Sequence, residues 1–238
     1  MAFKNAQKSR VIVGQTSFSG YTRTVETGIT VDMLETTTLV DTAKAFIPGQ
    51  SDASFSLGLI LDTDTTANGE WDRATTWKSA TPVAVTYGPS GLAALDEVFL
   101  IGALEASFST SSTVSGTVDA AITAQPDGGA DAGISLSDLE AVTVDGNGTA
   151  RDLTAASTNG GVGHLHVTAF SGLTSNDITI EDSADGSTGW ATILTFTQVT
   201  GLTSQRLAIT GTVRRYLRVV DNVTGVGSCT RQVSFARR

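Results

Sequence analysis

The sequence contains a single cysteine, Cys229, and only four prolines among its 238 residues. One cysteine cannot form an intrachain disulfide, which excludes the framework of a small, disulfide-rich secreted domain. The two histidines lie next to no serine elbow and no obvious orienting carboxylate, so a nucleophilic triad has no candidate base. We therefore expect a protein that is not an enzyme, with stability that comes from packing and from assembly.

Long apolar runs are missing as well. No stretch approaches the roughly 18 apolar residues that a membrane-spanning helix needs, and no apolar segment follows the basic start of the chain, as it would in a signal peptide. We expect no membrane span and synthesis in a reducing cytoplasm. Basic residues are scarce, with 15 Lys and Arg against 24 Asp and Glu, a net charge of −9. This balance argues against a protein that binds nucleic acid tightly, because such binding requires Lys and Arg side chains that neutralise the phosphates.

Hydrophobic residues make up 40% of the chain, aromatic residues only 6%, and Thr, Ser, Val and Gly are abundant. Side chains branched at Cβ pack well on a pleated surface, so this composition favours strands over helices. We predict an all-β protein, a β-sandwich or barrel, with one or two short helices at residues 67–77 and 92–95.

A Pro- and Gly-rich segment at residues 125–133 indicates a boundary between two β domains, 1–127 and 128–238. The first part has fourteen acidic and seven basic residues, and the second has ten and eight. The two parts share a similar succession of strands and acidic loops, so an internal duplication is one open alternative.

The strands that we expect are short and are separated by Gly and Asx turns. In the first domain they lie at 10–13, 29–38, 53–61, 82–87, 97–109 and 114–122, the last of which closes the domain, and in the second at 163–170, 177–182, 193–197, 206–209, 213–220 and 229–235. Residues 39–52 form a long connection, and connections of this length are usually functional or flexible. We expect this one to reach a neighbouring molecule.

The segment 41–57 contains Phe46-Ile47-Pro48-Gly49 between a Thr-rich strand and an Asp/Ser/Phe/Ser strand. It resembles the tail tube proteins, or major tail proteins, of long-tailed, siphovirus-type bacteriophages. Residues 180–186 and 211–219 are similar to the C-terminal region of major tail proteins from phages of actinobacteria, so the resemblance extends over most of the chain. It implies a structural virion protein that polymerises as stacked rings into the tube that conducts DNA from capsid to host.

The same resemblance implies the partners and the location in the phage tail. Six tube domains form a ring in this family, so a duplicated chain would assemble as a trimer, and a chain with one tube domain and an outer decoration domain as a hexamer. The tape measure protein and the tail terminator are implied partners, and DNA passes through the lumen without specific binding. The N-terminal arm and the loop at 39–52 are the candidates for contact between rings.

Seven residues are candidates for contacts between subunits. They are Phe46, Ile47, Pro48 and Gly49 in the long connection, and Arg214, Arg215 and Arg218 near the C-terminus. Strand alternation places Arg215 opposite to Arg214 and Arg218, so the three arginines do not form one basic surface. With an excess of carboxylates on the chain, we expect them to form salt bridges at an interface.

Other patterns carry less chemistry. His164 and His166 point to one face of a strand but lack a third ligand nearby, and the acidic loops at 62–69 and 181–186 lack the distal Glu of a calcium loop. We expect no metal and no cofactor. The alternative function is a carbohydrate-binding module, with Trp190 as a stacking platform, or a capsid-decoration module on the virion surface.

Overall fold

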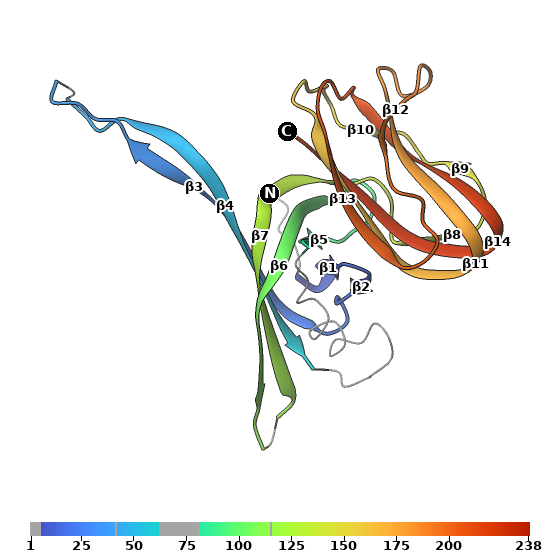
Figure 1. The fold of residues 1–238 in the computed structure, drawn as a ribbon, viewed down its shortest axis with the longest axis horizontal. Helices are drawn as coiled ribbons and strands as arrows, with labels where there is room; N and C mark the ends of the chain where they lie inside the picture. Colours follow the sequence, from blue (N-terminus) through green and yellow to red (C-terminus); the bar gives the residue numbers. More distant parts are fainter. Residues whose placement is uncertain (1–5, 41, 62–80, 115) are drawn as a thin grey trace.

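The computed structural model describes residues 6–40, 42–61, 81–114 and 116–238, and it confirms the all-β class (Figure 1). The described strands form one antiparallel sheet of fourteen strands. The only helix in these ranges is the 3-10 turn η1 (Ala6–Lys8), and no described helix could cross a membrane. The predicted helix at 67–77 falls outside the described residues, and the one at 92–95 is instead a turn, in which the Asp96 amide donates to the Ala93 carbonyl.

The first half of the chain folds as a sheet that curls back on itself. Its strands are β1 (Arg10–Val13), β2 (Thr16–Ser17), β3 (Thr22–Glu35), β4 (Phe46–Ile60), β5 (Val83–Gly88), β6 (Glu97–Ser112) and β7 (Val118–Ser135). They pair in the order β3-β4-β7-β6-β5-β1-β2. Because alternate residues of β4 point inward, Phe55 and Leu57 pack in the same core as Val11 and Phe18 from the other end of the sheet.

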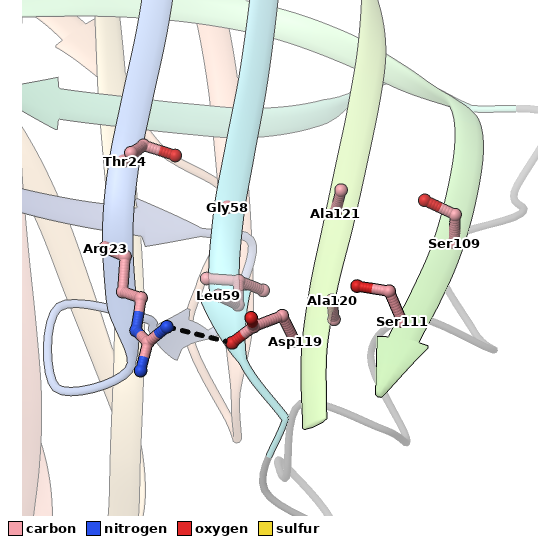
Figure 2. Close-up of a pocket in the computed structure, with 9 residues that line it drawn as sticks. All are labelled: Arg23, Thr24, Gly58, Leu59, Ser109, Ser111, Asp119, Ala120 and Ala121. Atoms are coloured by element: carbon pink, nitrogen blue, oxygen red, sulfur yellow. Dashed lines mark hydrogen bonds and ion pairs between the residues drawn. The ribbon is translucent and has the colours of Figure 1, made fainter. Parts of the chain in front are cut away.

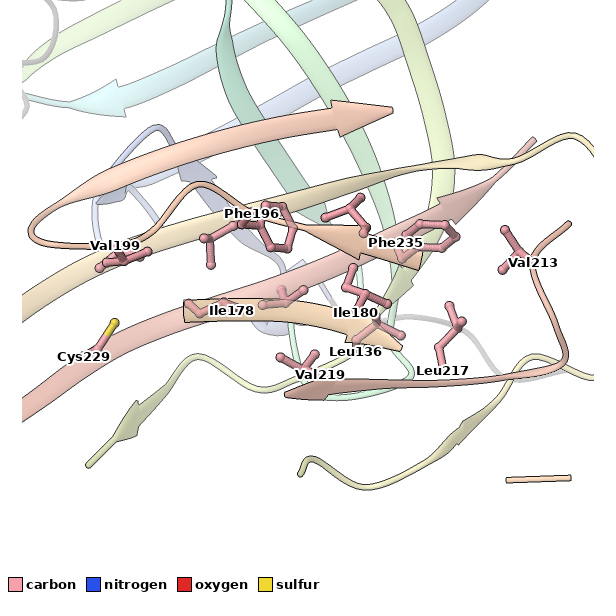
Figure 3. Close-up of a cluster of buried hydrophobic side chains, with 14 of the residues drawn as sticks. Leu136, Ile178, Ile180, Phe196, Val199, Val213, Leu217, Val219, Cys229 and Phe235 are labelled. Carbon is pink, nitrogen blue, oxygen red and sulfur yellow. The ribbon is translucent and has the colours of Figure 1, made fainter. Parts of the chain in front are cut away.

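The second half is built around two long strands. Its strands are β8 (Glu140–Val142), β9 (Gly146–Asn147), β10 (Arg151–Asp152), β11 (Gly161–Ser183), β12 (Ala191–Thr195), β13 (Thr203–Ile209) and β14 (Tyr216–Arg237). The strands β11 and β14 pair along nearly their whole length. Side chains from both ends of these strands, such as Ile180 and Phe235, meet in one core (Figure 3).

The prediction of four short strands at 163–170, 177–182, 213–220 and 229–235 was wrong, because β11 and β14 each join two of them. The register between the strands shifts on either side of Leu173, which lies opposite Gly225. Gly172 and Gly225 have φ of 76° and 100°, a backbone conformation that favours glycine. The glycines that predicted turns therefore form β-bulges, which bend a strand without ending it.

The predicted linker at 125–133 also lies within a strand. The strand β7 continues through it, with a bulge where Pro126 pairs with Ala103 and Ala130 pairs with Ile101. The end of β7 pairs with β14 of the second half, Ile134 opposite Phe235. The division into domains at residue 127 stays a prediction, but the two large clusters of buried apolar side chains draw on residues 11–124 and 136–235 respectively.

Candidate assembly surface

Four strands of the first half, in the order β3-β4-β7-β6, form a sheet with two different faces. Inward-pointing residues of β4 and β7, such as Leu57 and Ile122, are buried. The residues between them are small and remain accessible to solvent. Paired residues form rows across all four strands on this outer face: Thr24, Gly58, Ala121 and Ser109 in one row, and Glu26, Ser56, Thr123 and Ser107 in the next.

The outer face contains a shallow depression of about 270 Å³ (Figure 2). Arg23 and Asp119 form an exposed ion pair at its end, with 3.1 Å between Nη1 and Oδ1. Gly58 lies at its centre, where an added Cβ would come within 2.4 Å of the Thr24 hydroxyl. Small side chains thus keep this face of the described sheet shallow.

Both edges of this four-stranded sheet are open among the described residues. The strand β3 pairs only with β4, and residues 109–112 of β6 pair only with β7, because the pairing of β6 with β5 ends at Ala103. Unpaired N–H and C=O groups along a strand are a template for pairing with another chain. The sheet can therefore be extended by a further strand on each side.

The strands β3 and β4 continue beyond the sheet as a two-stranded arm (Figure 1). In the arm they pair from Ile29 opposite Ala53 to Glu35 opposite Phe46, while the pairing of β4 with β7 ends at Phe55. Eight apolar side chains of the arm are at least 46% exposed: Ile29, Val31, Met33, Leu34, Leu39, Val40, Phe46 and Ile47. An isolated two-stranded hairpin is marginally stable in water, so we expect the arm to be covered by another molecule.

The second half of the long connection predicted at 39–52 is strand, since β4 begins at Phe46. Ile47 lies opposite Leu34, and Pro48 lies opposite Met33. Gly49 permits close approach of the two strands, because a Cβ there would lie 3.2 Å from the Asp32 carbonyl oxygen. Phe46 and Ile47 are about half exposed. A contact of these four residues with a neighbouring subunit stays a prediction.

The three candidate arginines pair with carboxylates of their own chain. The Arg214 Nε donates to Asp182 at 2.7 Å, and the Arg218 Nε donates to Glu181 at 2.8 Å. Arg215 forms two hydrogen bonds to Asp152, of 2.7 and 2.6 Å. The pairs stabilise the second half locally, and a role between subunits stays a prediction.

Replacement of Arg215 by alanine is expected to raise the pKa of Asp152, because it removes the hydrogen bonds that hold this carboxylate. The hydrogen bond from Arg215, aided by the backbone hydrogen bond from Thr154, lowers the pKa of Asp152 from 3.8 to about 2. In Arg215→Ala the pKa should rise toward 3.8, which a carboxyl NMR titration would measure. Lys44→Ala, far away on the arm, is the control and should leave this pKa unchanged. An unchanged titration in Arg215→Ala would contradict the pairing.

The remaining candidates of the second half have structural partners. Asp185 accepts hydrogen bonds from the Ser187 and Thr188 amides and so closes its own turn. Trp190 lies under the Arg218 guanidinium, 4.3 Å from the ring centroid, so one face of this ring is not available for sugar stacking. The loop at 62–69 lies outside the described residues. Within the described ranges, no group of three His, Cys, Asp or Glu residues could hold a metal ion.

No protein-family model and no curated protein matches the sequence. Several solved structures are similar to this chain at a low level. A chain from the virion of a native gene transfer agent particle matches with a TM-score of 0.43 and 11% identity over 54% of this chain and 97% of that chain. A chain of the PVC sheath–tube complex, an extracellular contractile injection system in the extended state, matches with a TM-score of 0.42 and 18% identity over 52% and 88%. The Dit protein of phage SPP1, described as a hub adsorption apparatus, matches with a TM-score of 0.41 and 12% identity over 96% and 98%. Similarities at this level do not assign the chain to a family.

Proposed function

We propose that this chain is a structural, non-enzymatic subunit of a phage tail tube, which closes into rings by pairing strand edges between neighbouring copies. The observation that carries the proposal is the four-stranded sheet with an open edge on each side. Residues 109–112 of β6 in one copy would pair with β3 of the next. Head-to-tail contacts of this kind close into a ring when the rotation between copies is a whole fraction of a turn.

The outer face of the sheet suits the wall of a channel for DNA. Its rows consist of small and hydroxyl-bearing residues, with the exposed carboxylate of Glu26 among them. With a net charge of −9, the chain offers DNA few cations that could bind phosphate. Repulsion acts over about 8–10 Å in physiological salt, so DNA would pass the wall without adhering to it.

The arm supplies the contact between stacked rings in this proposal. It projects from the sheet (Figure 1). Its apolar side chains are left about half exposed or more by their own chain. Burial against a copy in the adjacent ring would remove this surface from water. The tape measure protein inside the tube and the terminator at its end are further partners of the proposed assembly.

The second half is proposed to decorate the outside of the tube. Among the described residues, a sheet with two open edges and a projecting arm occurs only once, in the first half. One tube domain per chain favours six chains in a ring over three. Each of the three candidate arginines in the second half forms its ion pair with a carboxylate of the same half. Such pairing does not require a neighbouring subunit, as expected for an outer domain.

Electron microscopy of the purified protein at rising concentration, with mass photometry of the smallest closed species, tests this proposal. Annuli or tubes with a ring mass of six chains would support it, and a ring of three chains would contradict the assignment of the second half. If the chain stays monomeric even when mixed with the proteins of a tail tip that initiates tubes, the proposal fails.

A further inference from the structure

The two halves of the chain meet at a buried group of hydrogen-bonding side chains. His164 and His166 on β11 face Thr86 on β5 and Gly14 in the turn between β1 and β2. The three side chains are fully buried. The Thr86 Oγ1 lies 3.1 Å from the His164 Nδ1 and 2.7 Å from the His166 Nε2. The His166 Nδ1 lies 2.7 Å from the Gly14 carbonyl oxygen.

These distances determine which atoms carry protons. A carbonyl oxygen only accepts, so the His166 Nδ1 donates to Gly14, and in a neutral ring its Nε2 is then an acceptor. The Thr86 hydroxyl has one proton and donates it to that Nε2, so it must accept from the His164 Nδ1. The donors therefore run in one direction, from His164 through Thr86 and His166 to Gly14. The far nitrogen of His164, Nε2, is buried with no partner among the described residues.

The surroundings of the two rings disfavour a positive charge. Burial, together with the neighbouring His166 and the Arg206 guanidinium of β13, lowers the pKa of His164 well below 6.5. Burial lowers the pKa of His166 to about 4, against the opposing effect of its bond to Gly14. The carboxylate of Asp131 on β7 pairs with Arg206 at 2.8 Å and with Arg238. Neither imidazole has a hydrogen bond to a carboxylate in the described ranges.

We propose that this chain of hydrogen bonds is an acid-sensitive latch that holds the second half against the first while both imidazoles are neutral. A proton added to the His166 Nε2 would place a charge in the junction and leave the proton of the Thr86 hydroxyl without an acceptor. A proton added to the His164 Nε2 would place a charge on a buried nitrogen that has no partner among the described residues. Opening would separate β11 from β5 and expose both rings to water. The latch would not depend on tube assembly, since it lies within one chain.

The direction of the pH dependence follows from the two states. The open state binds protons with an ordinary histidine pKa near 6.5, and the closed state binds them only at lower pH. The closed state is therefore fully favoured above about pH 6.5 and loses this preference as the pH falls toward 4. For His166 alone, a pKa of 6.5 when open and about 4 when closed raises the open fraction about 30-fold between pH 7.5 and pH 5.

A thiol placed in the junction would measure the opening. Val98 is 2% exposed and packs with Ile12, Leu100 and Ala236, an apolar cluster to which both halves contribute. In the full chain with Val98→Cys, the rate of reaction with dithiodipyridine, divided by that of the exposed control Val226→Cys, should rise at least about 30-fold from pH 7.5 to pH 5, because His164 adds to the effect of His166. The native Cys229, buried in the core of the second half, reports global unfolding in the same sample and should stay protected.

His166→Gln in the Val98→Cys background removes the contribution of His166 and should reduce the rise about 30-fold relative to the Val98→Cys protein, which leaves the contribution of His164. An unchanged ratio in the Val98→Cys protein would overturn the proposal, and so would equal exposure of Cys229, because the whole chain would then unfold. These outcomes need no second variant, so they stand even if His166→Gln does not fold. They are also independent of whether rings form, which separates this proposal from that of the tail tube.

Discussion

The double substitution Leu34→Lys/Ile47→Glu is expected to raise the concentration needed for the proposed tube assembly at least ten-fold while the subunit stays folded. The two residues lie opposite each other on the arm and are 55% and 51% exposed. Burying one such side chain fully contributes about 1.5–3 kcal/mol, and these two are already half covered, so together they contribute about 2 kcal/mol at each contact. A loss of 1.4 kcal/mol corresponds to a factor of ten in an equilibrium constant.

The paired charges keep the hairpin itself intact, since Lys and Glu opposite each other attract. Sedimentation or light scattering against concentration would measure assembly, and circular dichroism would confirm the fold. Val226→Lys is the matched control, because Val226 is 92% exposed on a strand of the second half and should have no effect on assembly. Equal assembly of the arm variant and the wild type would show that the arm is not part of the contact.

Asp221→Ala is expected to lower the free energy of unfolding by about 3–5 kcal/mol, because it leaves a buried guanidinium without its main partner. Arg231 donates to the two oxygens of Asp221, with distances of 3.1 Å from Nε and 2.5 Å from Nη2, and both side chains are 4% exposed. Asn176 also donates to Asp221, at 2.9 Å. Urea unfolding monitored by tryptophan fluorescence would measure the loss.

Arg231 has a second carboxylate partner that serves as the control. Glu140 lies 2.9 Å from Arg231 but its side chain is 50% exposed, so Glu140→Ala should cost less than about 1 kcal/mol. The paired replacement Asp221→Leu/Arg231→Met should recover much of the stability, because it leaves no charge unpaired. If Asp221→Ala lowered the free energy of unfolding no more than Glu140→Ala, the prediction would be wrong, and water would have to reach the Arg231 guanidinium in the native state.

Sequence patterns predicted several strands of the first half, and they failed where a glycine can serve either in a turn or in a β-bulge. The strand at 10–13 was placed correctly, and those at 82–87 and 97–109 nearly so. Gly172 and Gly225 were read as turns, but each lies in a bulge of a strand longer than 20 residues. A positive φ suits a turn and a bulge equally, so only the paired strand opposite decides between them.

The candidate surface was predicted in part. Phe46 and Ile47 were predicted to lie in a loop that reaches a neighbouring molecule, and they are exposed on the arm. The arm itself was not predicted as a hairpin of two strands. Alternation of apolar and polar residues in its first strand, within residues 22–35, is weak because both faces of the arm meet solvent. The carboxylate partners of the arginines could not be predicted, since Asp152 lies 63 residues from Arg215. The hydrogen bonds of His164 and His166 likewise join β11 to β5, about 80 residues away in the sequence.

The continuity of β7 between the halves has a mechanical consequence. This strand pairs with β4 and β6 in the proposed channel wall and with β14 in the second half. A load applied to the second half would travel along the backbone of β7. Because such a load runs parallel to the strands, it would shear many ladder hydrogen bonds together, whereas a flexible tether would simply extend. While the junction between the halves is closed, the second half is therefore coupled stiffly to the proposed channel wall, and a pull on the second half would reach that wall.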